Sequence, residues 1–383
     1  MAPKKLITGE FVKSLLLNDF RSYPALDISF DGRPVVLYGE NGAGKTNLLE
    51  AVSLLSPGRG LRRAKMMDLA RKEGGELHGT WTVAAKLGHE DINVGTGAVQ
   101  GAPNRRQMRV DGKPASGPDV AKYIRINWLT PAQDRLFSGS ASDRRKFFDR
   151  LCLIHMPSHG RTFLAYEKSR AERGRLFADG IDDPYWFDAL ETDMAERGAK
   201  IALARWQVVE MLKTEIGSRP EGSFPKADIA IDGEAEALYA AGAEELEVTE
   251  YIKTNLAKDR ALDARAGRTL RGVHKSDLLV THTEKSMPAA HCSTGEQKAL
   301  LIGLVLAHAR SQSDRPPILL LDEVAAHLDE HRRAALIEEL LELGTQVFLT
   351  GTDANLFSAF AGRAQMFEVA RGKLALQTSN LAG

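Results

Sequence analysis

"YGENGAGKTNLLEA", residues 38–51, decides the fold class, because it joins a buried strand to a helix through a glycine-rich turn. The apolar run "PVVLY" (34–38) leads into it, and "KTNLLEAVSLLS" (45–56) continues it with helical spacing. The stretch fits the pattern G-x-x-x-x-G-K-[ST], in which backbone N–H groups and a helix N-terminus bind phosphate oxygens. The sequence therefore predicts a nucleotide-binding loop in an α/β domain.

Individual residues of this loop have expected roles in binding a nucleoside triphosphate. Glycines let consecutive backbone N–H groups converge on phosphate oxygens, and the helix N-terminus adds a favourable positive potential. Lys45 is expected to reach the terminal phosphates, and Thr46 is expected to ligate magnesium. ATP and Mg2+ are therefore the predicted cofactors. The predicted nucleotide-binding residues of the loop are Gly39, Glu40, Asn41, Gly42, Ala43, Gly44, Lys45, Thr46 and Asn47.

A second segment, "ILLLDE" (318–323), is a continuous apolar run that ends in two adjacent acids. Such a run is typical of a strand that is buried on both faces. Because ligands collect at the carboxyl ends of strands in open α/β sheets, Asp322 is expected near the metal and Glu323 near the attacking water. Lys45, Asp322 and Glu323 form the predicted catalytic set, with Glu323 as the general base. A strand that merely ends in solvated carboxylates is the alternative interpretation.

Two compatible interpretations apply to "CSTGEQKALLIGLVLAHA" (292–309). Ser293 and Glu296 fit a capping box ahead of an apolar helix. Ser293, Gly295 and the helix N-terminus also fit a second anion site, similar to the "LSGGQ" signature of ABC-type ATPases, and Glu296 is included in this predicted site. Thr294 replaces a glycine of the signature and narrows the backbone freedom there. In a head of that type the signature contacts ATP held by a second copy, which implies a homodimer closed by ATP.

Two polar segments near the C-terminus resemble further parts of such heads. In "VAAHLDEHRR" (324–333), Asp329 stands where a D-loop residue crosses the dimer seam, but it equally fits an ordinary helix N-cap. The segment "FLTGTD" (348–353), at the end of the next expected strand, lacks the histidine with which transporter-type heads sense the γ-phosphate. Slow hydrolysis is therefore expected. The residues that could replace this histidine are Thr350, Thr352 and Asp353.

The remaining pattern indicates an α/β head that is interrupted by helices. With 383 residues, 43% of them hydrophobic, the chain can bury a large core in one domain or two. Short strands with glycine turns in 80–112 predict an antiparallel lobe, and helical spacing prevails over 136–220. The predicted fold class is α/β, with a mixed sheet, an antiparallel lobe and an inserted α-helical arm. The predicted domains are the N-terminal lobe of the head (1–130), the inserted helical arm (131–222) and the C-terminal lobe of the head (223–383).

Composition bounds the partners and the compartment. Lys plus Arg and Asp plus Glu both total 51, so the net charge of zero by itself predicts neither a nucleic-acid nor a membrane partner. The charges are nevertheless separated, since 59–72 and 141–175 are rich in bases whereas 231–250 carries acids and no base. The chain has two cysteines, no apolar N-terminal stretch and no uncharged run of 18 residues. These features predict a cytoplasmic protein without a disulfide framework.

Two other groups of residues have plain structural explanations. Cys152, His155 and His159 could suggest a metal site. However, Pro157 interrupts the helix that would align them, and no fourth ligand is near in the sequence. Packing in the core or in the arm, rather than stacking on bases, is expected for Trp128, Trp186 and Trp206.

Taken together, these motifs resemble the RecF family of recombination and gap-repair ATPases, which is related to the SMC heads. The resemblance covers nearly the full length and implies an ABC/SMC-type P-loop ATPase head. The arm is too short for the long coiled coil of an SMC protein. The stretches that carry the resemblance are "LLLNDFRSY" (15–23), "LYGENGAGKTNLLEAVSLLSPGRGLR" (37–62), "LTPAQDRLFSGSASDRRKFFD" (129–149), "GRTLRGVHKSDL" (267–278), "STGEQKALLIGLVLA" (293–307) and "LLLDEVAAHLDEHRR" (319–333).

The resemblance implies an ATP-dependent homodimeric clamp that acts on DNA at the single-strand/double-strand junctions of gaps. Such a clamp would work with RecR and RecO to place RecA on single strands, and would so support repair, replication restart and the SOS response. The implied enzyme is a weak, DNA-stimulated, Mg-dependent ATPase of the cytoplasm, associated with the nucleoid and not with a membrane. The alternatives are a transporter nucleotide-binding domain, another SMC-like head, and a module that uses ATP only to hold a dimer together.

The resemblance also assigns residues outside the loop. Arg21 and Ser22 of "NDFRSY" match positions that contact nucleotide phosphates, and Gln133 of "LTPAQD" matches the Q-loop residue that touches magnesium. "GVHKSD" departs from the usual "GPHRDD", which leaves His274 and Lys275 without a role. Solvated surface charge is the alternative for every base predicted to contact DNA, namely Arg59, Arg62, Arg63, Lys65, Arg105, Arg106, Arg109, Arg144, Arg145 and Lys146.

Overall fold

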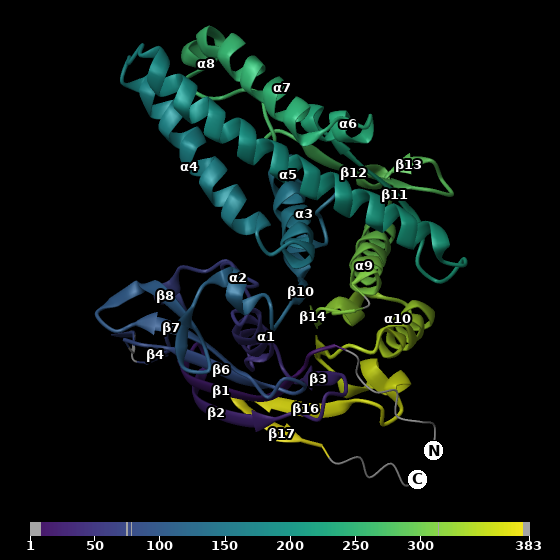
Figure 1. Ribbon diagram of the computed structural model, residues 1–383. Helices are drawn as coiled ribbons and strands as arrows, with labels where there is room; N and C mark the ends of the chain where they lie inside the picture. The colour runs from purple at the N-terminus through teal and green to yellow at the C-terminus, as the bar shows by residue number, and fades with distance from the viewer. Residues whose placement is uncertain (1–8, 74–75, 78, 313, 378–383) are drawn as a thin grey trace. The chain divides into compact units, whose positions relative to one another are not determined.

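A computed structural model of the 383-residue chain describes residues 9–73, 76–77, 79–312 and 314–377 (Figure 1). The chain forms two compact units, each built from segments that are far apart in the sequence. The first unit contains the chain up to Asp134, Glu221–Phe224 and the chain from Leu301 onward. The second contains Arg135–Pro220 and Pro225–Leu300. The sequence-based division assigned residues 225–300 to the head, whereas in the structure they pack with the helical arm.

A mixed six-stranded sheet positions the phosphate-binding loop in the first unit. Strands β10, β14, β15, β3 and β16 run parallel in this order, and β17 pairs antiparallel with β16. Strands β14 and β15 are buried along their whole length, as expected for apolar runs in a sheet covered on both faces. The strands are β3 (Val35–Tyr38), β10 (Ile126–Leu129), β14 (Ile318–Leu321), β15 (Val347–Gly351), β16 (Gln365–Ala370) and β17 (Lys373–Leu376).

The predicted antiparallel lobe is a second six-stranded sheet, in the order β2-β1-β6-β7-β8-β9. Asp111 and Gly112 turn β8 into β9 with positive φ angles of 46° and 75°, as a two-residue hairpin turn requires. The ring of Trp81 packs edge-on against Phe20 inside this lobe. The strands are β1 (Val12–Phe20), β2 (Tyr23–Ser29), β6 (Thr82–Leu87), β7 (Asn93–Val99), β8 (Ala102–Val110) and β9 (Lys113–Ala115), and β4 (Lys72–Glu73) pairs separately with β5 (Glu76–Leu77).

One hydrophobic core joins the two sheets of the first unit. Helix α1 (Lys45–Ser53) contributes Leu48, Leu49 and Val52 to this core, together with residues of both sheets. Apolar packing therefore fixes the helix that follows the phosphate-binding loop from Leu48 onward. The other helices of this unit are α2 (Gly117–Val120) and α10 (Glu330–Leu343), and its short 3₁₀ turns are η1 (Met66–Leu69), η2 (Pro131–Gln133), η4 (Val324–His327) and η5 (Ala354–Phe360).

Three helices build the arm in the second unit, namely α3 (Ala141–His155), α4 (His159–Ala178) and α5 (Pro184–Ser218). Figure 1 shows α4 and α5 as a pair of long helices that lie side by side. The 35 residues of α5 span roughly 50 Å at 1.5 Å per residue. Pro184 occupies the first turn, and the Asp183 side chain caps the helix by accepting a hydrogen bond from the Tyr185 N–H.

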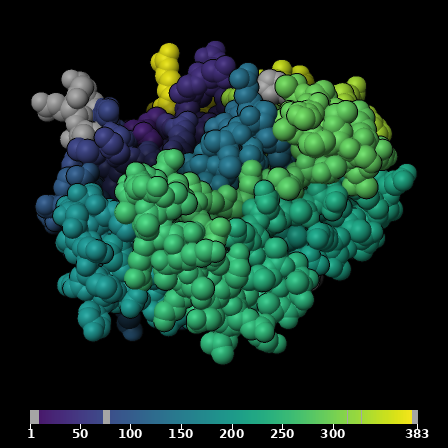
Figure 2. Space-filling view, turned by 90° about the horizontal axis from the view of Figure 1, so that it is seen from above, coloured from purple at the N-terminus to yellow at the C-terminus, as the bar shows by residue number. Residues whose placement is uncertain are grey.

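Residues 225–300 join the arm because they share its core. Tyr166 and Met194 of the arm belong to one apolar cluster with Val248, Ile252 and Val273. Figure 2 shows this second unit in teal and green as one continuous surface. Helix α9 (Thr294–Ser311) begins in the second unit and ends in the first. The other elements here are β11 (Ala227–Asp232), α6 (Glu234–Ala240), α7 (Glu245–Lys258), α8 (Arg260–Ala266), β12 (Asp277–His282), β13 (Met287–Pro288) and η3 (Ala289–His291).

The three tryptophans with a predicted packing role differ in exposure. Trp128 is buried in β10, and Trp206 is half-buried with its ring stacked on Tyr239, so packing is confirmed for both. Trp186 is 62% exposed in the first turn of α5, so the prediction is wrong for this residue. Its neighbour Phe187 takes the inward position at this turn, stacked on Phe177.

Candidate nucleotide-binding site

The phosphate-binding loop runs from the end of β3 to the start of α1, as predicted. Gly39 has a φ of 142°, and a Cβ at this position would lie 2.4 Å from the Val369 carbonyl oxygen. Gly44 has a φ of 114°, and a Cβ there would lie 2.9 Å from the Ser22 hydroxyl oxygen. Both positions therefore require glycine. Among the described residues no side chain caps α1 at Gly44, which leaves the first N–H groups of the helix available to an anion.

The ammonium group of Lys45 lies inside this loop. The side chain is only 4% exposed, and Nζ donates hydrogen bonds to the carbonyl oxygens of Gly39 (2.6 Å) and Glu40 (2.8 Å). Burial lowers the pKa of Lys45, while the nearby carboxylates of Glu323 and Asp322 oppose that shift. An ammonium group held in this way is poised to exchange carbonyl partners for the oxygens of a terminal phosphate.

Thr46 and Asp322 meet although 276 positions separate them in the sequence. The Thr46 hydroxyl donates to Oδ1 of Asp322 over 2.9 Å. Asp322 follows β14, and its backbone N–H donates to the Leu129 carbonyl at the end of the neighbouring β10. A hydroxyl and a carboxylate in contact are hard oxygen ligands, which suit Mg2+ bound together with a substrate phosphate. The side chains present therefore fit the predicted magnesium site.

Gln133 lies at the same edge of the sheet, just after β10. Its amide oxygen accepts hydrogen bonds from the backbone N–H (3.1 Å) and the hydroxyl (3.4 Å) of Thr130, so it caps the short turn η2. Contact with a metal would require this side chain to leave Thr130. The structure thus places Gln133 at the predicted edge but engages it in a local cap.

Arg21 and Ser22 lie beside the start of α1. The Arg21 guanidinium forms two hydrogen bonds with the carboxylate of Glu50, at 2.8 and 3.0 Å. The Ser22 hydroxyl accepts a hydrogen bond from the Asn47 amide over 2.9 Å. Glu50, whose buried carboxylate holds Arg21 near the loop, is a further residue of the site that was not predicted from the sequence. Its place one turn after Thr46 on a helix that is otherwise apolar at that point is the signal that could have found it.

The signature segment begins α9 in the second unit. Ser293 and Glu296 form the predicted capping box: Glu296 accepts from the Ser293 N–H (3.0 Å) and hydroxyl (2.8 Å), and the Ser293 hydroxyl accepts from the Glu296 N–H (3.4 Å). The ammonium of Lys285 also binds Glu296 and, as the largest cause, lowers the pKa of this carboxyl to about 2. Ser293, Thr294 and Gly295 are exposed, so their backbone is accessible to a second molecule.

The site residues predicted near the ends of β14 and β15 make different contacts in the structure. Asp329 is exposed and caps α10 by accepting from the Arg332 N–H, which confirms the helix-cap interpretation and leaves the D-loop role as a prediction. Asp353 caps η5 through the Asn355 N–H. Thr350 alone of the three residues considered for the missing histidine is held against Asp322 in the described structure, at 2.8 Å.

Several arginines that were predicted to contact DNA form hydrogen bonds within the protein instead. The Arg106 guanidinium donates to the carbonyls of Leu54, Ser56 and Gly58, and burial lowers its pKa to about 10. Arg144 forms a bidentate pair with Asp277 at 2.8 and 2.6 Å, and Arg145 donates to the Ser276 carbonyl. These bonds make Arg106 and Arg144 poor phosphate ligands. The exposed members of the predicted set are Arg59, Arg62, Arg63, Lys65, Arg105, Arg109 and Lys146.

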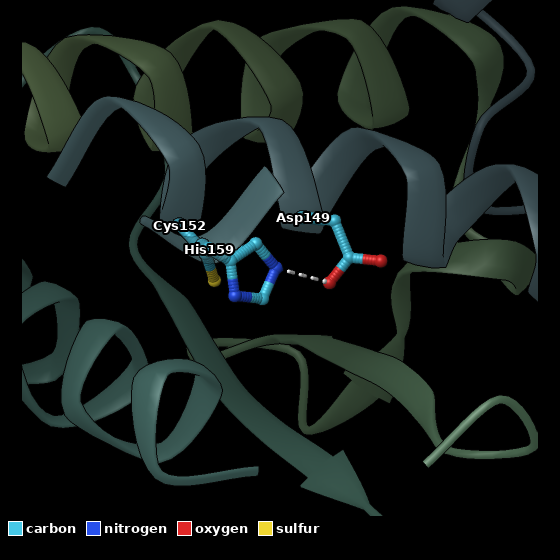
Figure 3. Close-up of side chains that lie close together, drawn as sticks. All are labelled: Asp149, Cys152 and His159. Carbon is cyan, nitrogen blue, oxygen red and sulfur yellow. Dashed lines mark hydrogen bonds and ion pairs between the residues drawn. The ribbon is translucent and has the colours of Figure 1, made fainter. Parts of the chain in front are cut away.

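A buried cluster in the arm contains two of the residues considered for a metal site. Figure 3 shows the His159 ring between the sulfur of Cys152 and the carboxylate of Asp149, and the three potential ligand atoms lie within 4.8 Å of one another. Asp149 accepts from His159 at 3.1 Å and from Arg205 at 2.8 and 3.0 Å. The Arg205 cation already neutralises this carboxylate, and burial raises the pKa of the Cys152 thiol. We therefore interpret the cluster as an ion-pair network that joins α3, α4 and α5.

Comparison with known proteins identifies the family. A curated relative from Mesorhizobium japonicum, named DNA replication and repair protein RecF, is 51% identical over 369 residues that cover 94% of this chain and 96% of the relative. The model of the family described as RecF/RecN/SMC N terminal domain matches residues 11–374. The chain belongs to the RecF family. RecF of Brucella suis is 50% identical over 370 residues, 95% of each chain, and RecF of Caulobacter vibrioides is 48% identical over 364 residues, 92% of this chain and 94% of the relative.

Solved structures show the same fold. The recombination mediator protein RecF with ATP, of the RecFOR pathway, matches this RecF-family chain with a TM-score of 0.79 at 23% identity, over 96% of this chain and 99% of that one. An Smc head domain from Pyrococcus furiosus matches with a TM-score of 0.53 at 14% identity, over 96% of each chain. The SMC/RecF head fold predicted from the motifs is confirmed. Within the described residues, no helix combines the length and the apolar character needed to cross a membrane.

Proposed function

We propose that this RecF-family chain is a weak Mg-dependent ATPase that ATP closes into a homodimeric clamp on DNA. The observation that carries the proposal is the meeting of Lys45, Thr46 and Asp322 around the uncapped start of α1. The curated relatives are named DNA replication and repair proteins, and the similar solved RecF carries ATP. Both facts support ATP as the nucleotide and DNA as the partner.

The chain's own groups would share the work of hydrolysis. Thr46 and Asp322, with Gln133 turned away from its cap, would hold Mg2+, which neutralises phosphate charge when it is bound. Lys45 pairs with the terminal phosphate oxygens, while the N–H groups of the loop and the start of α1 bind the others. Glu323 takes the proton of the attacking water. Without a histidine at the end of β15, turnover is slow, and DNA stimulates it.

A second copy would complete the site in this proposal. Ser293, Gly295 and Glu296 contact the ATP held by the partner, and Asp329 crosses the seam. ATP bonded from both sides stabilises the dimer and not the monomer, so binding and association become one equilibrium. Residues 1–130 would supply the phosphate-binding lobe, and the C-terminal part of the chain would supply the signature at Ser293 and the acidic end of β14. Residues 131–222 would form the arm, with which 225–300 pack.

The clamp would act at single-strand/double-strand junctions of gaps in DNA. Arginines and lysines exposed on the first unit, between Arg59 and Arg109, are the proposed phosphate contacts. The similar solved RecF belongs to the RecFOR pathway, which supports RecR and RecO as partners. Together they would promote RecA loading, replication restart and the SOS response, in the cytoplasm at the nucleoid.

The proposal is tested by light scattering with and without ATP and gapped DNA, on the wild type and on Lys45→Met. We expect the mass to double with ATP for the wild type and to remain that of one chain for Lys45→Met. Lys213→Met, at an exposed arm lysine paired with Glu210, is the control and should behave like the wild type. A wild-type mass of one chain under all conditions would overturn the clamp.

A further inference from the structure

Thr350 lies where the two acids of the site can both be reached. It stands near the end of β15, beside β14, and the parallel register pairs Leu349 with Leu321, directly before Asp322. The side chain is 1% exposed, so its hydroxyl must be satisfied inside the protein. Both partners that it finds belong to the acidic end of β14.

The hydroxyl of Thr350 uses its donor and its acceptor capacity at once. It donates to Oδ1 of Asp322 over 2.8 Å and accepts from the backbone N–H of Glu323 over 2.8 Å. The same Oδ1 also accepts from Thr46 over 2.9 Å. A valine has nearly the same shape but can make neither bond, whereas a serine can make both.

The bond to Glu323 matters because this residue has an unusual backbone. Glu323 has φ 53° and ψ 22°, in the left-handed region that residues with a Cβ rarely adopt. Such a conformation persists only where surrounding contacts hold it. The Thr350 hydroxyl supplies one of these contacts, and the backbone of Glu323 determines where its carboxylate points.

We infer that Thr350 is a positioning residue for ATP hydrolysis, acting through the carboxylate of Asp322 and the backbone of Glu323 rather than on the phosphate itself. This inference rests on the proposed ATPase function. Asp322 is fixed through one oxygen by two threonine hydroxyls, from α1 and from β15. The residue thus couples the metal-binding acid to the general base, a different task from sensing the γ-phosphate.

The test compares Thr350→Val and Thr350→Ser with a matched control. Thr345 is also buried and lies just before β15, at the opposite end of this strand from Thr350. Its hydroxyl donates to the Pro317 carbonyl over 2.8 Å. Thr345→Val therefore removes an equally buried hydroxyl bond away from the site. Each protein is measured for steady-state kcat, for the Mg2+ concentration that gives half-maximal activity, for binding of a fluorescent ATP analogue in EDTA, and for amide exchange at Glu323 without nucleotide.

For Thr350→Val we expect kcat to fall by about 10- to 100-fold and the Mg2+ concentration for half-maximal activity to rise about tenfold, the range typical of residues that support metal ligands. Analogue binding in EDTA should change by less than about threefold. Exchange at Glu323 should become at least about tenfold faster. Thr350→Ser should recover wild-type values to within about threefold, and Thr345→Val should change none of the four readouts beyond that range.

Unchanged kcat in Thr350→Val, or equal losses in the valine and serine variants, would overturn the inference, whatever happens to exchange at Glu323. Faster exchange with unchanged kcat would mean that Thr350 holds the backbone without positioning catalysis. The proposed function fails separately if the wild type binds the analogue and hydrolyses no ATP. In that case faster exchange in Thr350→Val still reports the hydrogen bond itself.

Discussion

At the residue scale, Glu323 combines a left-handed backbone with a place directly after the proposed metal-binding Asp322. Glu323→Gln keeps the size of the side chain and the Thr350 bond to its N–H but removes the proposed base. We expect kcat to fall at least about 100-fold while ATP binding persists. Light scattering should then find long-lived ATP-bound dimers on gapped DNA. Unchanged turnover, or an unchanged balance of monomer and dimer, would contradict a role for Glu323 as the base.

Arg106 offers a second residue-scale prediction, because the structure gives it a structural task. Its guanidinium donates to three backbone carbonyls and to the Thr96 hydroxyl at 2.7 Å. Arg106→Met would leave these acceptors without their donor, at a cost of about 3 kcal/mol in the free energy of unfolding. Urea titration measures this loss. The exposed neighbour Arg105→Met is the control and should change stability by less than about 0.5 kcal/mol.

At the residue scale, the sequence predicts the residues of the phosphate-binding loop better than it predicts the contacts of single arginines. Lys45 and Thr46 were predictable because a short local pattern fixes their chemistry. The partner of Arg144, in contrast, is Asp277, which lies 133 positions away, and no local pattern announces such a pair. Whether a basic side chain is free for DNA depends on these distant contacts. The basic set could therefore be proposed from the sequence but not sorted.

At the element scale, the segment Gly267–Asp277 depends on a half-buried histidine, His274. His274 accepts from the Tyr166 hydroxyl at Nδ1 (2.9 Å) and donates from Nε2 to the Thr269 carbonyl (3.0 Å), which fits the neutral ring. Burial lowers its pKa from 6.5 to about 4. The unfolded chain therefore takes up the proton first, so this contribution to stability is intact above pH 6.5 and is lost as the pH falls toward 4.

We accordingly expect His274→Gln, which cannot titrate, to lose less stability than the wild type between pH 7.5 and pH 4.5. The difference between the two slopes should integrate to about 1–3 kcal/mol, since one pKa unit corresponds to about 1.4 kcal/mol. Urea titrations of both proteins at several pH values measure it, because the other titrating groups cancel in the difference. Parallel stability curves would show that His274 does not titrate on unfolding.

The start of α5 provides a matched pair of aromatic residues. Phe187 is 4% exposed, stacks on Phe177 with ring centroids 4.9 Å apart and lies under the Arg260 guanidinium, whereas Trp186 next to it is exposed. Phe187→Ala should lower the free energy of unfolding by about 3 kcal/mol, and Trp186→Ser by less than about 0.5 kcal/mol. Urea titration followed by circular dichroism measures both. Equal losses would contradict the assigned orientation of this turn.

Helices and strands were largely predictable from apolar spacing, but their grouping was not. The strands β3, β14 and β15 appear as short apolar runs, and α5 as a long amphipathic pattern. The sequence predicts that residues 225–300 belong to the head, because the pattern typical of strands returns there. Their packing on the arm depends on side chains such as Val248 and Ile252. These side chains share one apolar cluster with Tyr166 and Met194, which lie more than 50 positions earlier in the sequence. Spacing predicts that a face is buried, and does not say against what.

At the scale of the whole molecule, zero net charge and DNA binding are compatible only if exposed bases gather locally. The first unit exposes six of the predicted contacts, and neutralising six phosphates gives a slope of roughly −5 for log K against log salt. Anisotropy of labelled gapped DNA, with ATP, from about 50 to 300 mM KCl measures this slope. The six residues are Arg59, Arg62, Arg63, Lys65, Arg105 and Arg109.

Replacing Arg63 and Lys65 together by glutamine should weaken binding equally on all DNA sequences and make the slope less steep by about 2 units, because each lost phosphate contact removes about one released counterion. Arg106→Met is the matched control, because its guanidinium is already bound to carbonyls, so its slope should stay that of the wild type. A wild-type slope near zero would remove DNA as the partner. A side chain whose N–H groups all donate to acceptors inside the protein binds no phosphate and so releases no counterion from DNA. If Arg106→Met made the slope less steep by as much as the double variant does, the division between structural and exposed arginines would be wrong.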